Sequence, residues 1–326
     1  MQWPVVAAIA GATVVGATVL SRASPDPATG AGPVAVLAAV VADGDARKAW
    51  LIGTSGEVYE PDGNGAWACR LQSFTASPLT AAGRAGANDH AVLAFGDGVI
   101  YRLAGNGWSA IRVVQHGKAV LGTGPRAIAA VGRQLFALDA PSRGGEPRKL
   151  ALAQAPVVAI ASGPAATVVA TEAGLWRLDP RGKLAPLTTF PAARLGAPAQ
   201  VRLVSDRWAI VARGALDLTT GALTPWPAGL AIGAAAATPD GWVAVGVSAA
   251  GLELVHLRRQ ALSRDPLGIP AAGATAVGVA VDRAGQAVVA LADGRIALRD
   301  RTGWSTTRVT TEPAAARPGP GPAASR

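Results

Sequence analysis

The sequence predicts an all-β protein: a seven-bladed β-propeller of four-stranded antiparallel blades behind an apolar N-terminal targeting or anchor segment. Three observations lead to this prediction. A two-strand pattern recurs seven times, its spacing is close to 40 residues, and 40 Gly and 24 Pro punctuate the 326 residues without a fixed triplet. No segment has helical periodicity long enough for a second domain, so residues 33–312 are assigned to the propeller.

Each copy of the repeat is an apolar strand, a glycine-containing turn and a second strand. Successive copies are separated by 42, 36, 40, 40, 35 and 45 residues, which is the length of one four-stranded blade. The turn glycine is expected to supply the positive φ of a tight hairpin. The copies begin at Trp50, Val92, Ile128, Val168, Trp208, Val243 and Val288.

The two strands of a copy differ in pattern. The first is almost continuously apolar, as expected when neighbouring blades bury both of its faces. The second alternates, which predicts that one face meets solvent. The clearest alternation sets Leu175, Arg177 and Asp179 against Trp176 and Leu178.

Two further strands complete each blade. Segments rich in Ala and Val, such as residues 34–41, 157–161 and 276–281, precede the pairs and suit the wall of a narrow apolar channel. More polar segments that follow the pairs suit the outer rim. Examples of these outer strands are residues 67–71, 108–113 and 304–309.

The two ends of the chain are predicted to lie outside the propeller. Residues 1–23 read as a signal peptide or membrane anchor, because residues 3–20 carry no charge. Residues 24–32 form a linker, and residues 313–326 a disordered Pro-rich tail. Export to the periplasm or anchoring in a membrane follows, although Arg22, after the apolar run, would favour a cytoplasmic propeller.

Three turns carry a family resemblance. Residues 60–67 (EPDGNGAW), 103–108 (LAGNGW) and 300–304 (DRTGW) each lead into a Trp. They resemble the hairpin turns of photosystem assembly-factor propellers and of the Asp-box repeats of sialidases, although the Ser and Thr usual in an Asp-box are missing. The resemblance implies a structural role for turn and Trp, and it carries over no catalytic residue.

Charge and cysteine content limit the partners. The 30 Lys and Arg exceed the 21 Asp and Glu by nine, but they are scattered. Nucleic acid is an unlikely partner because the one local cluster is too small to track a phosphate backbone. Cys69 is alone, so it forms no intrachain disulfide and is interpreted as a small core residue. The basic cluster is His256, Arg258, Arg259 and Arg264.

The repeat pattern does not bring potential catalytic or metal-ligating side chains together in one place. Tyr59 and Tyr101 fall in second strands, away from the channel. His90 and His116 have no ligand spacing, and His256 is the one titratable group that stands out. Most acidic residues occupy turns, where Asp accepts backbone N–H bonds. These turn residues are Asp62, Asp97, Asp139, Asp179, Asp240, Asp293 and Asp300.

The sequence therefore assigns no catalytic, cofactor-binding or metal-ligating residue and no cofactor. It favours a non-enzymatic interaction or assembly scaffold that docks a protein on a loop face or outer edge, with membrane contact through residues 3–20 if these are retained. Two alternatives stay open. One is a glycan- or lactone-acting hydrolase with its site at the channel mouth, and the other is a polyanion-binding propeller.

Overall fold

The computed structural model describes the following residues: 36–41, 49–62, 67–71, 78–85, 91–96, 98–104, 107–112, 118–122, 124, 126–138, 147–163, 166–188, 201–238, 241–258, 261–282 and 285–309. The signal or anchor segment 1–23, the linker 24–32 and the tail 313–326 lie outside these residues. Within them, no helix is long and apolar enough to cross a membrane.

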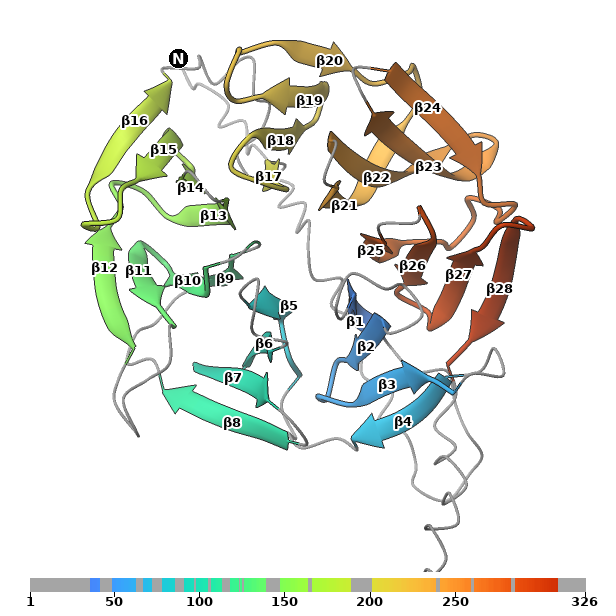
Figure 1. Ribbon diagram of the computed structural model, residues 1–326, viewed down its shortest axis with the longest axis horizontal. Helices are drawn as coiled ribbons and strands as arrows, with labels where there is room; N and C mark the ends of the chain where they lie inside the picture. Colours follow the sequence, from blue (N-terminus) through green and yellow to red (C-terminus); the bar gives the residue numbers. More distant parts are fainter. Residues whose placement is uncertain are drawn as a thin grey trace, which may run out of the picture.

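Strands in groups of four form seven antiparallel sheets arranged in a ring (Figure 1). Blades 1 to 3 contain β1 (Val36–Val41), β2 (Ala49–Gly53), β3 (Val58–Pro61) and β4 (Trp67–Leu71); β5 (Ala81–Ala85), β6 (Ala91–Gly96), β7 (Val99–Ala104) and β8 (Gly107–Arg112); and β9 (Ala119–Leu121), β10 (Ile128–Val131), β11 (Gln134–Ala137) and β12 (Arg148–Leu152). Blades 4 and 5 contain β13 (Val157–Ser162), β14 (Thr167–Thr171), β15 (Gly174–Leu178) and β16 (Leu184–Thr188); and β17 (Arg202–Leu203), β18 (Trp208–Val211), β19 (Gly214–Asp217) and β20 (Leu223–Pro225). Blades 6 and 7 contain β21 (Ala231–Thr238), β22 (Gly241–Ser248), β23 (Gly251–Arg258) and β24 (Ala261–Pro266); and β25 (Ala276–Val281), β26 (Ala287–Leu291), β27 (Arg295–Arg299) and β28 (Trp304–Arg308).

Each sheet consists of four consecutive strands in chain order. The first strand of a blade lies nearest the centre of the ring and the fourth lies at the rim (Figure 1). The second strands begin within two residues of the predicted repeat starts, which confirms the seven-bladed architecture. Their first residues are Ala49, Ala91, Ile128, Thr167, Trp208, Gly241 and Ala287.

Seven apolar clusters hold the described part of the ring together, one between each pair of neighbouring blades. Strand β14 shows how one strand serves two of them. Val168 and Ala170 belong to the cluster with blade 5, whereas Val169 belongs to the cluster with blade 3. The unbroken apolar run of the second strands thus arises, as predicted, because both faces are buried.

The ring closes between blade 7 and blade 1. Leu51 and Tyr59 of blade 1 pack there with Val288 and Ile296 of blade 7. No described strand crosses from one sheet into the other. Among the described residues, side-chain packing therefore carries this closure without a shared β-ladder.

The third strands depart from the predicted pattern. Leu175 lies on the same face of β15 as the exposed Arg177, yet it is buried in the cluster between blades 4 and 5. Leu178, on the other face, is buried against blade 3. The prediction of one solvent-facing side is wrong here, because neighbouring blades reach both faces of the third strand.

The glycine prediction holds at six of the seven turns. The exception is the fifth copy, where Gly214 is not in the left-handed region; instead, a Cβ there would clash with the Thr224 carbonyl oxygen. A glycine is required here because β20 approaches too closely for a side chain, and not because the backbone has a positive φ. The six glycines with positive φ are Gly56, Gly98, Gly132, Gly174, Gly251 and Gly294.

The Trp residues that open outer strands pack at blade interfaces. Trp67 is buried in the cluster between blades 1 and 7, and Trp304 packs against the cluster between blades 6 and 7. Trp108 of blade 2 donates its indole N–H to the Gly56 carbonyl oxygen of blade 1 at 3.1 Å. These three Trp residues therefore have structural roles at blade interfaces.

Removing apolar contacts from the closing interface is expected to destabilise the protein. Ile296→Ala deletes a wholly buried side chain between blades 7 and 1, so we expect it to lower the free energy of unfolding by about 2–5 kcal/mol. Urea titration followed by tryptophan fluorescence measures the loss. Ser305→Ala, at an exposed position of β28, is the control and is expected to change stability little. Equal effects of the two substitutions would contradict the assignment of closure to this cluster.

Candidate functional site

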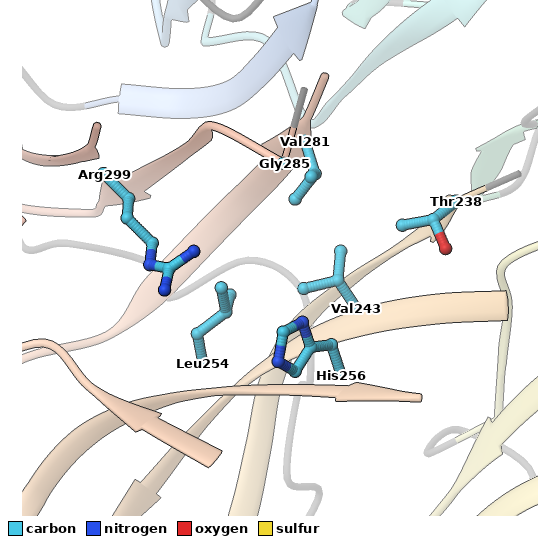
Figure 2. Close-up of a pocket in the computed structure, with 7 residues that line it drawn as sticks. All are labelled: Thr238, Val243, Leu254, His256, Val281, Gly285 and Arg299. Atoms are coloured by element: carbon cyan, nitrogen blue, oxygen red, sulfur yellow. The ribbon is translucent and has the colours of Figure 1, made fainter. Parts of the chain in front are cut away.

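A pocket of about 100 Å³ lies between blades 6 and 7 (Figure 2). Strands β21, β22 and β23 contribute one wall, and β25, the turn after it and β27 contribute the other. Residues about 60 positions apart in the chain therefore meet in one site. The lining residues are Thr238, Val243, Leu254, His256, Val281, Gly285 and Arg299.

The topology places this pocket toward one face of the propeller. Thr238 and Val281 are the last residues of β21 and β25, the first strands of blades 6 and 7. Arg299 is the last residue of β27, the third strand of blade 7. In every blade the turns after the first and third strands lie on the same face, because successive strands are antiparallel. We call this the pocket face, and the face that carries the turns after the second strands the opposite face.

The lining combines an apolar floor with polar groups. Val243 and Leu254 are buried members of the cluster between blades 6 and 7, and Val281 packs against them. Figure 2 shows Arg299 and Thr238 at the two ends of the group, with His256 between them. A small ligand in this pocket would meet aliphatic carbon on one side and N–H donors on another.

Arg299 is the charged group of the pocket. Its Nε lies 2.5 Å from Oδ2 of Asp265 on β24, so the ion pair joins blade 7 to blade 6. The contact is not aligned as a hydrogen bond, and Asp265 Oδ2 is a buried oxygen that accepts none. Within the described part of the chain, Arg299 also donates no hydrogen bond to any other group. Among the described residues, its guanidinium is therefore held by the charge of Asp265 and by no aligned hydrogen bond.

His256, the titratable group that the sequence singled out, lies in the pocket. It is half-buried on β23, opposite Val243 on β22 and Ser263 on β24. The predicted basic cluster around it does not form a free patch, because Arg264 is bound to Glu253. Arg259 and the side chain of Arg258 lie outside the described residues.

The Glu253 carboxylate is buried on the same blade. Arg264 donates from Nε and Nη2 to its two oxygens at 2.5 and 2.7 Å, and Ser248 donates its hydroxyl at 2.6 Å. The hydrogen bonds from Arg264 and then from Ser248 hold the pKa of Glu253 below its usual value. This network fixes β22, β23 and β24 to one another outside the pocket.

The turn aspartates are structural where the structure describes their turns. Asp179 accepts the Lys183 N–H at 2.8 Å, Asp293 accepts the Arg295 N–H at 3.1 Å, and Asp300 accepts the Thr302 N–H at 2.7 Å. These bonds confirm the sequence interpretation for three residues. Asp97, Asp139 and Asp240 lie outside the described residues, as does most of the turn after Asp62.

The remaining residues considered in the sequence lie away from the pocket. Tyr59 is buried in the closing interface, where burial raises the pKa of its phenol, and Tyr101 is half-buried on β7. Cys69 is half-buried at the edge of the same interface and is not fully in the core. Burial, and to a smaller extent the negative charge of Glu57, raises the pKa of its thiol. His90 and His116 lie outside the described residues.

The inner strands are less apolar than predicted, and Arg202 is the clearest departure. Arg202 lies on β17, the innermost strand of blade 5, and is half-buried. Burial lowers the pKa of its guanidinium. No described residue forms an ion pair with it. The alternation of Val201, Arg202 and Leu203 was visible in the sequence, but this two-residue strand was not assigned there.

Metal-ligating side chains were also considered together. Among the described residues, no three or more His, Cys, Asp and Glu side chains gather closely enough to hold a metal ion.

No protein-family model and no curated protein sequence matches the chain. Solved structures do. YCF48 from Cyanidioschyzon merolae is 16% identical with a TM-score of 0.58, covering 87% of this chain and 97% of YCF48. A structure of YCF48 bound to D1 peptide is 15% identical with a TM-score of 0.57, covering 86% of this chain and 94% of that one. A streptogramin B lyase is 16% identical with a TM-score of 0.59, covering 80% of this chain and 91% of the lyase.

A third similar structure is longer. The extracellular domain of BT4673, a putative hybrid two-component system from B. thetaiotaomicron, is 13% identical with a TM-score of 0.57, covering 86% of this chain. The chain spans 39% of that domain's length. At these identities the comparisons establish the β-propeller fold alone. The finer resemblance to photosystem assembly factors and Asp-box repeats stays a prediction.

The Glu253–Arg264 pair is expected to make the free energy of unfolding decrease at acidic pH. Because the pKa of Glu253 is lowered in the folded protein, its contribution is present above the ordinary value of 4.5 and is lost as pH falls through the lower folded value. We expect Glu253→Gln to cost about 1–3 kcal/mol at pH 7 and less at pH 3, by urea titration at both pH values.

The exposed pair of Glu60 and Arg70 provides a control for this measurement. Its atoms are 2.5 Å apart, but both side chains are about one-third exposed. Glu60→Gln is expected to cost less than about 1 kcal/mol at pH 7. A Glu253→Gln penalty that is the same at pH 7 and pH 3 would argue against the linkage.

Thr238 offers a test of the polar groups around the pocket. Its hydroxyl oxygen is buried and has no hydrogen-bond partner among the described residues. We expect the isosteric Thr238→Val to raise the free energy of unfolding by about 1 kcal/mol, since an unsatisfied polar group is removed. Thr306→Val, on the exposed side of β28, is the matched control. A loss of stability in Thr238→Val would show that the hydroxyl has a partner in solution.

Proposed function

We propose that this protein is a non-enzymatic interaction platform that docks a protein partner on the pocket face, at blades 6 and 7. The observation that carries the proposal is the arrangement of Arg299 and His256 around a 100 Å³ pocket with an apolar floor. Pockets for drug-sized ligands occupy about 300–1,000 Å³. The volume found here suits one side chain or one end group of a larger partner.

Similar folds support this proposal. YCF48, a propeller of comparable length, has been solved with a bound D1 peptide, so a ring of this kind can hold a peptide. The extracellular domain of BT4673 supports placing this propeller outside the cytoplasm. We accordingly propose an exported or membrane-tethered protein, attached through residues 3–20 if that segment is retained. N-terminal sequencing of the protein isolated from its own cells decides between cleavage and anchoring.

The second candidate function is an enzyme. His256 and Arg299 together could serve a hydrolase or lyase, and a streptogramin B lyase is among the similar structures. Turnover of model glycosides, esters and lactones that is abolished by His256→Gln would favour this candidate. The polyanion-binding alternative rests on the net charge of +9, and the one local basic cluster adds little to it because Arg264 already neutralises Glu253.

Site-specific cross-linking tests the proposed docking face. A photoreactive amino acid at Arg301, exposed beside the pocket, is expected to capture a partner protein in cells, whereas the same group at Ala250, exposed on the opposite face, is expected to capture much less. The adduct from position 301 should decrease at least fivefold with Arg299→Gln, which removes the charge of the pocket. Equal capture from both positions, or capture indifferent to Arg299, would reject docking at this face.

A further inference from the structure

We propose that the pocket between blades 6 and 7 binds a carboxylate group borne on a short aliphatic chain. The inference deepens the proposed function, because it names the chemical group by which a partner would be recognised. It depends on three features of the described residues: an Arg side chain that donates no aligned hydrogen bond to any of them, an apolar floor and a small volume.

The donors of Arg299 are the first feature. A guanidinium carries five N–H donors in a planar fork that matches the two oxygens of a carboxylate. Asp265 lies 2.5 Å from Nε, but it receives no aligned hydrogen bond. Because Arg299 donates to no other described residue, the fork can donate to a second carboxylate. The imidazole of His256 lines the same pocket, so the NMR signals of its nitrogens can report ligand binding.

The floor and the volume select among anions. Val243, Leu254 and Val281 place aliphatic carbon opposite the donors. A phosphate or sulfate would set several charged oxygens against this surface without hydrogen bonds, which is costly. A carboxylate has its two oxygens at one end, and the methylene groups that follow can lie on the valines and the leucine. A pocket of about 100 Å³ holds such a group but not a ring system.

The acidic neighbours of the pocket moderate the affinity without filling the site. Asp265 partly neutralises Arg299 through their ion pair, and it is not among the lining residues. Asp282, in the turn that carries Gly285, is buried and accepts the Gln286 N–H at 2.8 Å. Binding of an isolated carboxylate is therefore expected to be weak, and removal of the Asp265 charge is expected to strengthen it.

Histidine nuclear magnetic resonance provides a direct test. The chain has three His, so protein labelled with ¹⁵N-histidine gives few signals, and His256→Gln identifies those of His256. Propionate is expected to shift the His256 signals saturably at constant pH and ionic strength. Its neutral isostere propionamide is expected to leave them unchanged. A larger or equal shift with phosphate, or no saturable shift with propionate, would overturn the proposal.

Three variants make the test specific. Arg299→Lys keeps the charge but loses the fork, so propionate should bind at least tenfold more weakly. Arg308→Lys, on the exposed side of β28, is the matched control and should bind propionate as the native protein does. Asp265→Asn should bind it several-fold more tightly. The unfolding temperature of each variant shows that the ring is intact. Unchanged affinity in a folded Arg299→Lys protein would refute the role of the fork.

Peptides distinguish the two sources of such a carboxylate in a partner. One peptide has an internal Glu and an amidated C-terminus; the other has Gln at that position and a free C-terminus. Whichever peptide displaces propionate identifies the source, and displacement by neither would limit the site to free short-chain acids. If cross-linking from position 301 is observed but propionate does not bind, carboxylate recognition is rejected and the interaction platform is retained. Propionate binding without cross-linking would reject the interaction platform.

Discussion

The packing of neighbouring blades is the constraint on which the rest of this structure depends. Each sheet is covered on both faces by other sheets, and seven apolar clusters occupy the seven interfaces of the described ring. A second strand such as β14 must therefore be apolar at successive positions, with Val168 directed to one neighbour and Val169 to the other. No blade could bury these surfaces alone, so the sheets are stable only as a closed set.

The same packing creates the pocket. Along the interface of blades 6 and 7 the core contains Val243, Leu254 and Val289, and it ends where the strands reach the pocket face. The side chains at that end are polar, because the strand ends lie beside the connecting turns and are exposed to solvent. Arg299 and His256 come from different blades, so their spacing is set by how the two sheets pack and not by either sheet alone. The site is a property of the interface.

The fold was largely predictable from the sequence, whereas the site was not. Blade positions follow from apolar runs and turn glycines, which are local signals. Leu175 and Gly214 departed from local rules because a neighbouring blade and an adjacent strand decide their surroundings. His256 was noticed as an isolated titratable residue, but nothing local relates it to Arg299, 43 positions later (299 − 256). Their meeting requires knowing how two sheets lie against each other.

A closed ring also explains how the protein can retain imperfectly satisfied polar groups at one interface. In a repeat architecture each unit interacts mainly with its two neighbours, so an unfavourable group at one interface affects the others little. Separation of blades 6 and 7 is further opposed because blade 7 is held on its other face to blade 1 by the cluster of Leu51 and Ile296. The buried hydroxyl of Thr238 and the misaligned pair of Arg299 and Asp265 can therefore persist. Arg299, which lines the pocket, is thus available to a ligand without prior rearrangement of the fold, which is the condition for a preorganised binding site.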